Sequence, residues 1–244
     1  MLVLAASLAL SSAAALQSPP QLNGMPLRKV QVGQNLPFVY EVDLLASDGG
    51  VQSHDPLSSC YWPAAAPLAA LVAQTTSQGE SCVELGCGTG LCSLTVVAAG
   101  GRCLATDVSQ VSLELTKAAA QAQALENLEC AAFDATDMGV PLPAGEVLIL
   151  SDVFVTDLLA RAYAERVAEA VAAGFRRVLV VDPGRTSRAT FLDELSRIGV
   201  SDHPGFQPAA DCLRRASCAP IAGKRSTQLL FLDTDQGIPV SYDI

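Results

Sequence analysis

The sequence predicts an α/β fold built on a mostly parallel sheet of seven strands that ends in an antiparallel hairpin. From residue 81 to residue 198, short apolar runs alternate with longer segments of helical spacing, which is typical of parallel strands joined by right-handed crossovers. The run at 146–153 is almost continuously apolar, as expected for a strand buried on both faces. Only five residues, 222–226, separate the last two apolar runs, so these are expected to form an antiparallel pair.

The expected elements follow one another along the chain. Residues 28–42 alternate polar and apolar side chains, which predicts a hairpin on the sheet edge. Apolar composition predicts seven strands, at 81–85, 102–108, 128–133, 146–153, 176–182, 213–221 and 227–232. Helical spacing and alanine content predict helices at 91–99, 112–125, 157–173 and 190–198. Thr156 is the expected N-cap of the third helix, and Gly199 ends the fourth.

The first 16 residues are small and apolar, without charge or proline. They are shorter than the roughly 20 residues of a membrane span, and Ser-Ala-Ala-Ala at 12–15 offers a cleavage site. We therefore expect a signal or targeting segment at 1–16, a linker at 17–27 and one domain at 28–244. This predicts passage into the secretory route, with a plastid as one onward destination and no membrane span after cleavage. A mitochondrial location is the alternative.

Composition narrows the classes of function. The chain has 244 residues, of which 50% are hydrophobic, and a formal charge of −10. It has no basic tract, so a nucleic-acid substrate is disfavoured. Most of the 8 cysteines lie in predicted core strands or helices, and without a C-x-x-C pair we expect no metal site. Whether Cys212 and Cys218 form a disulfide stays open.

The glycine motif VELGCGTG at 83–90 is the most informative chemical feature. Glycine accepts positive φ and lets a ligand approach the backbone. The motif joins a predicted strand to a predicted helix, and Asp107 ends the next strand. Open α/β sheets bind ligands at the carboxyl ends of their strands. The motif and Asp107 therefore predict a site for a cofactor that carries a nucleoside.

The glycine spacing favours one cofactor. Gly86, Gly88 and Gly90 are spaced G-x-G-x-G rather than the G-x-G-x-x-G of dinucleotide sites. Glu84 would repel a pyrophosphate and would favour a ligand with positive charge. S-adenosylmethionine carries an ammonium, a sulfonium and ribose hydroxyls for Asp107, so we expect it as the cofactor. A nicotinamide or flavin, and a glycine turn that binds nothing, are the alternatives.

Further segments carry a family resemblance. Tyr61-Trp62-Pro63, the glycine motif, Asp107, the segment SDVFV at 151–155 and the segment DPGR at 182–185 follow in this order. Together they resemble the class I, seven-β-strand S-adenosylmethionine-dependent methyltransferases, whose sheet is Rossmann-like. Among these, the chain is most similar to the protein-lysine methyltransferases that act on the electron-transfer flavoprotein β subunit. The resemblance covers about residues 58–200.

The resemblance implies roles for the matching residues. The cofactor's methionine end would lie against Glu84, Gly86, Gly88 and Gly90. Asp107 would hold the ribose. Asp134 would lie near the adenine, and Trp62 would pack over the pocket. Plain core packing is the alternative role for Trp62.

The resemblance also implies a catalytic residue. Asp152 matches the first acid of the family's Asp-x-x-Tyr motif, which lies beside the target lysine, but Val155 replaces the tyrosine. Capping of the following helix is the alternative role for Asp152. The implied activity is methyl transfer to a lysine of a protein partner. A small-molecule methyltransferase is the first alternative. A non-catalytic module that binds S-adenosylmethionine is the second, because of Val155.

Overall fold

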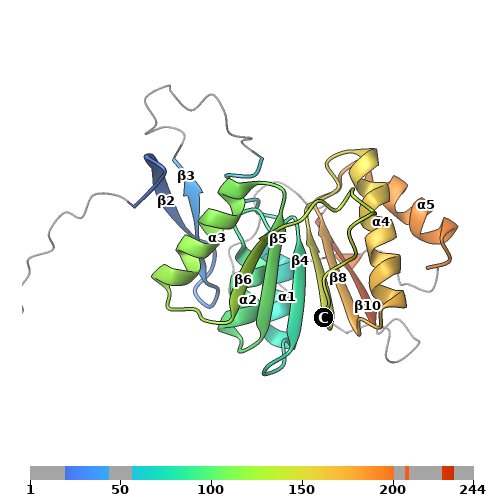
Figure 1. Cartoon of the computed structure of the whole chain (residues 1–244), viewed down its shortest axis with the longest axis horizontal. Helices are drawn as coiled ribbons and strands as arrows, with labels where there is room; N and C mark the ends of the chain where they lie inside the picture. The colour runs from blue at the N-terminus through green and yellow to red at the C-terminus, as the bar shows by residue number, and fades with distance from the viewer. Residues whose placement is uncertain (1–19, 44–56, 201–206, 209–226, 234–244) are drawn as a thin grey trace, which may run out of the picture.

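The computed structural model describes residues 20–43, 57–200, 207–208 and 227–233. Within these ranges, a sheet of seven strands carries helices on both faces, and a second sheet of three strands lies beside α3 (Figure 1). The strands are β1 (Gln21–Leu22), β2 (Met25–Gln31), β3 (Phe38–Val42), β4 (Ser81–Leu85), β5 (Arg102–Asp107), β6 (Leu128–Ala132), β7 (Val147–Ser151), β8 (Arg177–Asp182), β9 (Gln207–Pro208) and β10 (Gln228–Asp233). The helices are α1 (Ala65–Thr75), α2 (Leu91–Ala98), α3 (Gln110–Ala122), α4 (Asp157–Ala172) and α5 (Arg188–Arg197).

The large sheet has the order β6-β5-β4-β7-β8-β10-β9. The first five strands in this order, β6, β5, β4, β7 and β8, are parallel to one another. Val83 of β4 lies opposite both Leu104 of β5 and Leu148 of β7. β10 runs antiparallel to β8 and to β9. The mostly parallel sheet with an antiparallel C-terminal end is confirmed. The strand predicted at 213–221 lies outside the described residues, and the described antiparallel neighbours of β10 are β8 and β9.

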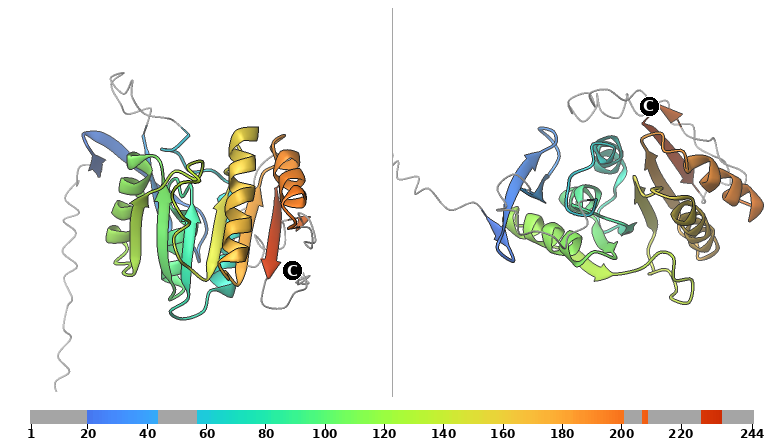
Figure 2. Two further views of the ribbon diagram at one scale, coloured as in Figure 1. Left: turned by 45° about the vertical axis from the view of Figure 1, so that its right-hand side comes forward. Right: turned by 90° about the horizontal axis from the view of Figure 1, so that it is seen from above.

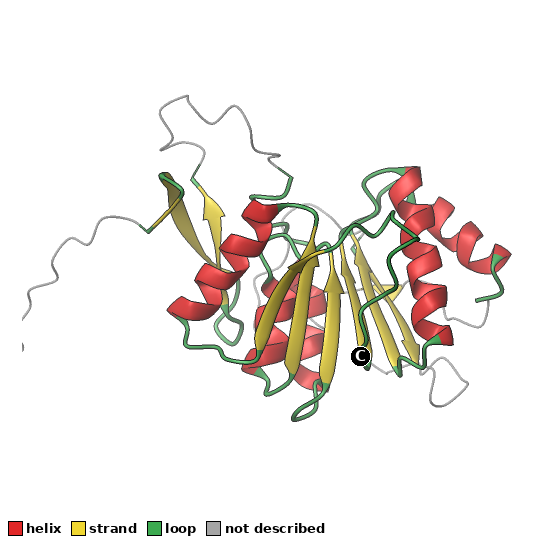
Figure 3. Cartoon of the chain, in the orientation of Figure 1, coloured by secondary structure: helices red, strands yellow, loops and turns green. Residues whose placement is uncertain are grey.

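The two faces of the sheet bury two separate cores, because successive side chains of a strand point to opposite faces. Cys82 and Ile149 pack with α1 and α2 on one face, where α3 also contributes side chains. Val83 and Leu148 pack with α4 and α5 on the other. Viewed from above, α1 to α3 lie on one side of the sheet and α4 and α5 on the other (Figure 2). Loops at both ends of the strands connect the sheet to the helices that cover it (Figure 3).

Most predicted helices are confirmed to within about two residues at each end. Thr156 is the N-cap of α4, and its side chain accepts a hydrogen bond from the Leu159 amide, as predicted. α1 was not predicted. Its segment AAPLAALVAQT is apolar on nearly every side and is buried without a break from Ala66 to Val72, so it lacks the one-sided pattern by which an amphipathic helix is recognised.

The N-terminal hairpin forms, but its predicted position on the edge of the large sheet is wrong. β1, β2 and β3 make a separate antiparallel sheet. Met25, Leu27 and Val42 from this sheet pack against Leu115 of α3. The apolar face of the hairpin is therefore buried by a helix rather than by strand pairing. β1 and the start of β2 lie within residues 17–27, where the sequence predicts a linker.

Some sequence predictions concern residues outside the described ranges. The targeting segment 1–16 and the pair Cys212 and Cys218 are among them. In the described part of the chain, Cys82, Cys92 and Cys103 are buried free thiols, as expected for small hydrophobic side chains. No helix in the described ranges combines the length and the apolarity that a membrane span requires.

Packing of the small sheet on α3 can be tested by truncating Leu115, which is fully buried. We expect Leu115→Ala to lower the free energy of unfolding by about 2–5 kcal/mol, because it removes buried methyl groups and leaves a cavity. The matched control is Leu158→Ala, at a helix position that is 70% exposed, with an expected change within about 0.5 kcal/mol. Urea denaturation of both variants would measure this. Equal destabilisation would contradict the packing described here.

Candidate active site

A cavity lies at the carboxyl ends of the parallel strands, where the strand order reverses between β4 and β7. Such reversals separate the loops that follow two neighbouring strands and are the usual ligand sites of open α/β sheets. Seven stretches of the chain line the cavity. The lining residues are Leu57, Ser58, Trp62, Gly86, Gly88, Asp107, Val108, Phe133, Asp134, Ala135, Ser151, Asp152, Val153, Val155, Leu159, Tyr163 and Arg185.

The glycine loop between β4 and α2 forms one wall of the cavity. Gly86 has φ +71°, and a Cβ there would lie 3.0 Å from Tyr163 Oη and from Val153 Cγ1. A side chain at this position would therefore be both strained and crowded. Gly90 also has positive φ, but it does not line the cavity. A Cβ at Gly90 would lie 2.4 Å from Thr116 Cγ2, so Gly90 lets α2 pack closely on α3.

Asp107 joins the glycine loop to the loop that follows β5. Its Oδ2 accepts a hydrogen bond from the Gly88 amide at 2.9 Å, and its Oδ1 accepts one from the Ser109 amide at 2.8 Å. Burial raises the pKa of this carboxyl, and the two backbone N–H groups counteract that effect. Each carboxylate oxygen has a further lone pair that could accept a hydrogen bond from a hydroxyl group. Asp107 therefore has the placement predicted for a residue that holds a ribose.

Glu84 does not line the cavity. It is 1% exposed, on the face of β4 that packs against α2. Its Oε2 accepts hydrogen bonds from the Ser93 amide, at 2.9 Å, and from the Ser93 hydroxyl. Burial raises its pKa to about 7 despite these bonds. The structure therefore gives Glu84 a role at the start of α2, behind the glycine loop, rather than the predicted contact with the methionine end of a cofactor.

The loop after β6 forms a second wall, where the sequence predicts the adenine. Phe133, Asp134 and Ala135 line the cavity here. Asp134 Oδ1 accepts hydrogen bonds from the amide and the hydroxyl of Thr136, which lower the pKa of the Asp134 carboxyl. The carboxylate is thus held in a turn at the edge of the cavity.

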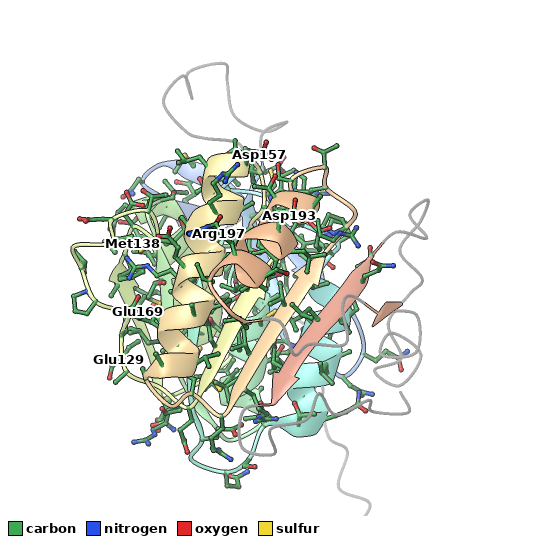
Figure 4. All side chains as sticks on the ribbon, turned by 90° about the vertical axis from the view of Figure 1, so that its right-hand side faces the viewer. Glu129, Met138, Asp157, Glu169, Asp193 and Arg197 are labelled. Carbon is green, nitrogen blue, oxygen red and sulfur yellow. The ribbon has the colours of Figure 1, made fainter. Side chains whose placement is uncertain are left out.

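The side chain of Arg166, which belongs to α4, holds the loop after β6 in place. It is 1% exposed, and its guanidinium donates to the carbonyl oxygens of Ala135, Asp137 and Val140. It also lies over the Phe133 ring, 4.9 Å from the centroid. Figure 4 shows Met138 of this loop on the same side of the molecule as Glu169 of α4, the carboxylate that pairs with Arg166. The second wall is therefore held rigidly onto α4.

Asp152 stands on the third wall, directly after β7. Its backbone has φ +58°, a left-handed conformation that aspartate tolerates better than most residues, and its amide bonds to the Val181 carbonyl of β8. Its carboxylate forms an ion pair with Arg185, with Nε at 2.5 Å from Oδ1. The N-cap of α4 is Thr156, so Asp152 is not that cap. Val155, where the resemblance implies a tyrosine, also lines the cavity and is 41% exposed.

Trp62 lies at the mouth of the cavity. It is 38% exposed, so plain core packing does not describe it, and its Nε1 donates to the Leu57 carbonyl at 2.8 Å. The Arg185 guanidinium carbon is 5.8 Å from the centroid of its ring. Trp62, Arg185 and Asp152 therefore form a continuous series of contacts along one side of the cavity.

The structure thus brings together all the predicted site residues except Glu84 and Gly90. It also adds residues that sequence reasoning missed. Tyr163 lines the cavity from α4, and burial raises the pKa of its hydroxyl, which stays protonated. Arg185 lines it from the loop after β8. Arg185 is part of a quoted motif, but nothing in the sequence indicated its pairing with Asp152, 33 residues earlier.

Comparison with known proteins agrees with this geometry. A family model described as a methyltransferase domain matches residues 82–182, the stretch from β4 to the end of β8. Over this stretch the chain is similar to methyltransferase domains. Among curated proteins, it is similar to the electron transfer flavoprotein beta subunit lysine methyltransferase of Danio rerio, with 26% identity over 134 residues. The match covers 54% of this chain, and the chain spans about half (51%) of the length of that relative.

Solved structures of similar fold include two bacterial enzymes. The TehB-like SAM-dependent methyltransferase of Corynebacterium glutamicum is 14% identical, with a TM-score of 0.48 over 68% of this chain and 85% of that one. The magnesium protoporphyrin IX methyltransferase of Synechocystis, solved with bound SAM, is 15% identical, with a TM-score of 0.49 over 69% of this chain and 76% of that one.

The cofactor of class I methyltransferases is S-adenosylmethionine, and the lining residues of this domain fit it. The charged side chains that line the cavity within the described ranges are Asp107, Asp134, Asp152 and Arg185. The wall is therefore net negative, which suits a ligand that carries a sulfonium and an ammonium. Phe133 and Val108 supply apolar surface beside Asp134 for a base. No group of three His, Cys, Asp or Glu side chains in the described part could hold a metal ion.

The role of Glu84 can be tested through pH. Its pKa is raised in the folded protein from 4.5 to about 7, so the folded state holds the proton more tightly than the unfolded chain. The contribution of Glu84 to stability therefore falls as pH rises through this window and is constant above it. We expect Glu84→Gln, which keeps an oxygen for the Ser93 amide, to gain stability over wild type across the window, by up to about 3 kcal/mol near pH 8.

Urea denaturation of the two proteins without cofactor, at about pH 5 and about pH 8, measures this difference. Comparison at each pH cancels the titration of all other groups. A stability difference that does not change with pH would refute the buried, proton-binding carboxyl.

Proposed function

We propose that the chain transfers a methyl group from S-adenosylmethionine to the side-chain amine of a lysine in a protein partner. One observation carries the proposal: a single cavity holds the glycine loop, Asp107 and Asp152. The first two suit the cofactor, and the third offers a carboxylate beside the place where a methyl group would be transferred. The similarity to a lysine methyltransferase, at 26% identity, supports lysine as the acceptor.

The chemistry needs little from the protein beyond positioning. S-adenosylmethionine supplies a methyl group on a sulfonium, which is already an activated leaving group. A lysine amine has a pKa of about 10.4 in water and must lose a proton before it can attack. Asp152 can hold the incoming ammonium by a charge-assisted hydrogen bond and align it. Desolvation in the cavity, with its apolar Val153 and Val155, favours the neutral amine.

The ion pair with Arg185 affects this role. Asp152 already accepts a hydrogen bond from Arg185 Nε. A substrate ammonium therefore shares the carboxylate with a guanidinium rather than meeting an isolated anion. This arrangement fixes the orientation of the carboxylate, and it weakens its attraction for any cation that cannot reach the hydrogen-bonding position.

Transfer of tritiated methyl groups tests the proposal directly. The purified protein is incubated with methyl-labelled S-adenosylmethionine and a cell lysate, and the products are resolved by gel and by solvent extraction. We expect label in a protein band, recovered as methyl-lysine after acid hydrolysis. Label in the small-molecule fraction would instead favour a small-molecule acceptor. Binding of S-adenosylmethionine without any transfer would favour a non-catalytic module. Binding of NAD in its place, measured by calorimetry, would contradict the cofactor.

Two substitutions separate the cofactor side from the transfer side. Asp152→Asn keeps an oxygen for Arg185 but removes the charge, so we expect turnover to fall about ten- to a hundredfold, with cofactor affinity changed less than about threefold.

Asp107→Ala should weaken cofactor binding about ten- to a hundredfold, because a charge-assisted hydrogen bond to the ribose is lost. Calorimetry and initial rates measure both effects, and thermal melting confirms folding. An equal loss of affinity and turnover in Asp152→Asn would overturn its assignment.

A further inference from the structure

Arg185 is the one basic side chain that lines the cavity within the described part of the chain. It emerges from the loop between β8 and α5, on the same side of the cavity as Asp152 and Trp62. Its partner Asp152 has a side chain that is only 5% exposed, whereas the side chain of Arg185 is 27% exposed. The guanidinium is thus the more accessible half of the pair.

Three contacts hold Arg185 in place. Asp182 is fully buried, and its Oδ2 accepts hydrogen bonds from the amides of Gly184 and Arg185, at 2.7 and 3.1 Å, which fixes the loop backbone. At the other end of the side chain, Nε donates to Asp152 at 2.5 Å. The face of the guanidinium lies against the Trp62 ring. The plane of the guanidinium is therefore set before any ligand arrives.

The outer edge of this guanidinium is unused by the described residues. A guanidinium has five N–H donors, of which Nε carries one. The hydrogen bond to Asp152 is made by Nε, and within the described ranges neither Nη group of Arg185 has a hydrogen-bond partner. Arg166 differs: it is 1% exposed, and it donates from Nε and from both Nη groups. Arg185 is therefore oriented like a structural arginine, yet it keeps its bidentate edge available.

We propose that the two Nη groups of Arg185 bind a carboxylate inside the cavity. A planar fork of N–H donors matches the two oxygens of a carboxylate, and such bidentate pairs are the strongest of the charge-assisted hydrogen bonds. Among the described residues, the other charged groups that line the cavity are carboxylates, so these residues offer a ligand carboxylate no cation other than Arg185. A ligand could then place an ammonium against Asp152 and a carboxylate against the neighbouring Arg185, so that each ligand charge meets a protein group of the opposite charge.

Two ligands can supply this carboxylate. One is the amino-acid end of S-adenosylmethionine. The other is an acidic group of the methyl acceptor, such as an acidic residue next to the target lysine. This second source rests on the proposed function, whereas the first requires only cofactor binding.

The cofactor arm of the test compares S-adenosylmethionine with its decarboxylated analogue, which lacks only the carboxylate. Calorimetry is carried out on wild type, Arg185→Gln and Arg185→Lys. If the cofactor supplies the group, wild type binds the analogue at least tenfold more weakly than S-adenosylmethionine, and Arg185→Gln binds both equally. Arg185→Lys, which keeps the charge near Asp152 but lacks the fork, gives an intermediate ratio. Arg161→Gln is the matched control, since Arg161 is 60% exposed and absent from the cavity wall.

The acceptor arm measures label transfer at saturating S-adenosylmethionine while the labelled lysate fraction is diluted. If the acceptor supplies the carboxylate, Arg185→Gln binds S-adenosylmethionine like wild type, but its KM for the acceptor rises at least tenfold. Thermal melting confirms that each variant is folded. The proposal is overturned if cofactor discrimination is the same in wild type and Arg185→Gln and the acceptor KM is unchanged, or if discrimination is the same and no acceptor is found. Absence of any transfer alone would refute only the proposed function.

Discussion

The carboxylate of Asp107 is the interaction on which the rest of the site depends. With one oxygen on the Gly88 amide and the other on the Ser109 amide, it joins the loops after two neighbouring strands. A buried backbone N–H needs a hydrogen-bond partner, and the carboxylate at the end of β5 supplies one to each of these two amides. These two loops are therefore joined before any ligand binds, and the two donors partly offset the cost of burying the charge.

Buried charge supports the site elsewhere, by the same principle. Glu84 receives the amide and hydroxyl of Ser93 at the start of α2. Asp182 receives two loop amides and an ion pair from Arg188. Arg166 satisfies three carbonyl oxygens of the loop after β6. Each of these side chains is nearly inaccessible. Asp182 and Arg166 each fix a loop that reaches the cavity, and Glu84 fixes the start of α2 behind the glycine loop. Rigid loops on a buried polar support are what precise positioning of a ligand requires.

The pair of Asp152 and Arg185 gives the cavity wall both signs of charge. An isolated aspartate would attract any cation, whereas a fixed pair discriminates by the arrangement of charges on the ligand. This explains how a net negative wall could suit a cofactor or acceptor that carries both an ammonium and a carboxylate. It also means that the residue assigned to catalysis and the residue assigned to carboxylate binding constrain each other, so their substitutions should not act additively.

The sequence by itself determined the alternation of strands and helices from residue 81 to residue 198, the parallel sheet, the glycine loop and the position of Asp107 at the end of its strand, because these follow from local periodicity and from residues adjacent in the chain. Only the tertiary structure decided the rest. Glu84 turned behind the loop because alternate residues of β4 face opposite helix layers, and Gly90 serves contact with Thr116 of another helix. The N-terminal hairpin packed on α3, and Arg185 met Asp152 and Trp62. Each of these depends on contacts between distant segments, which no local pattern specifies.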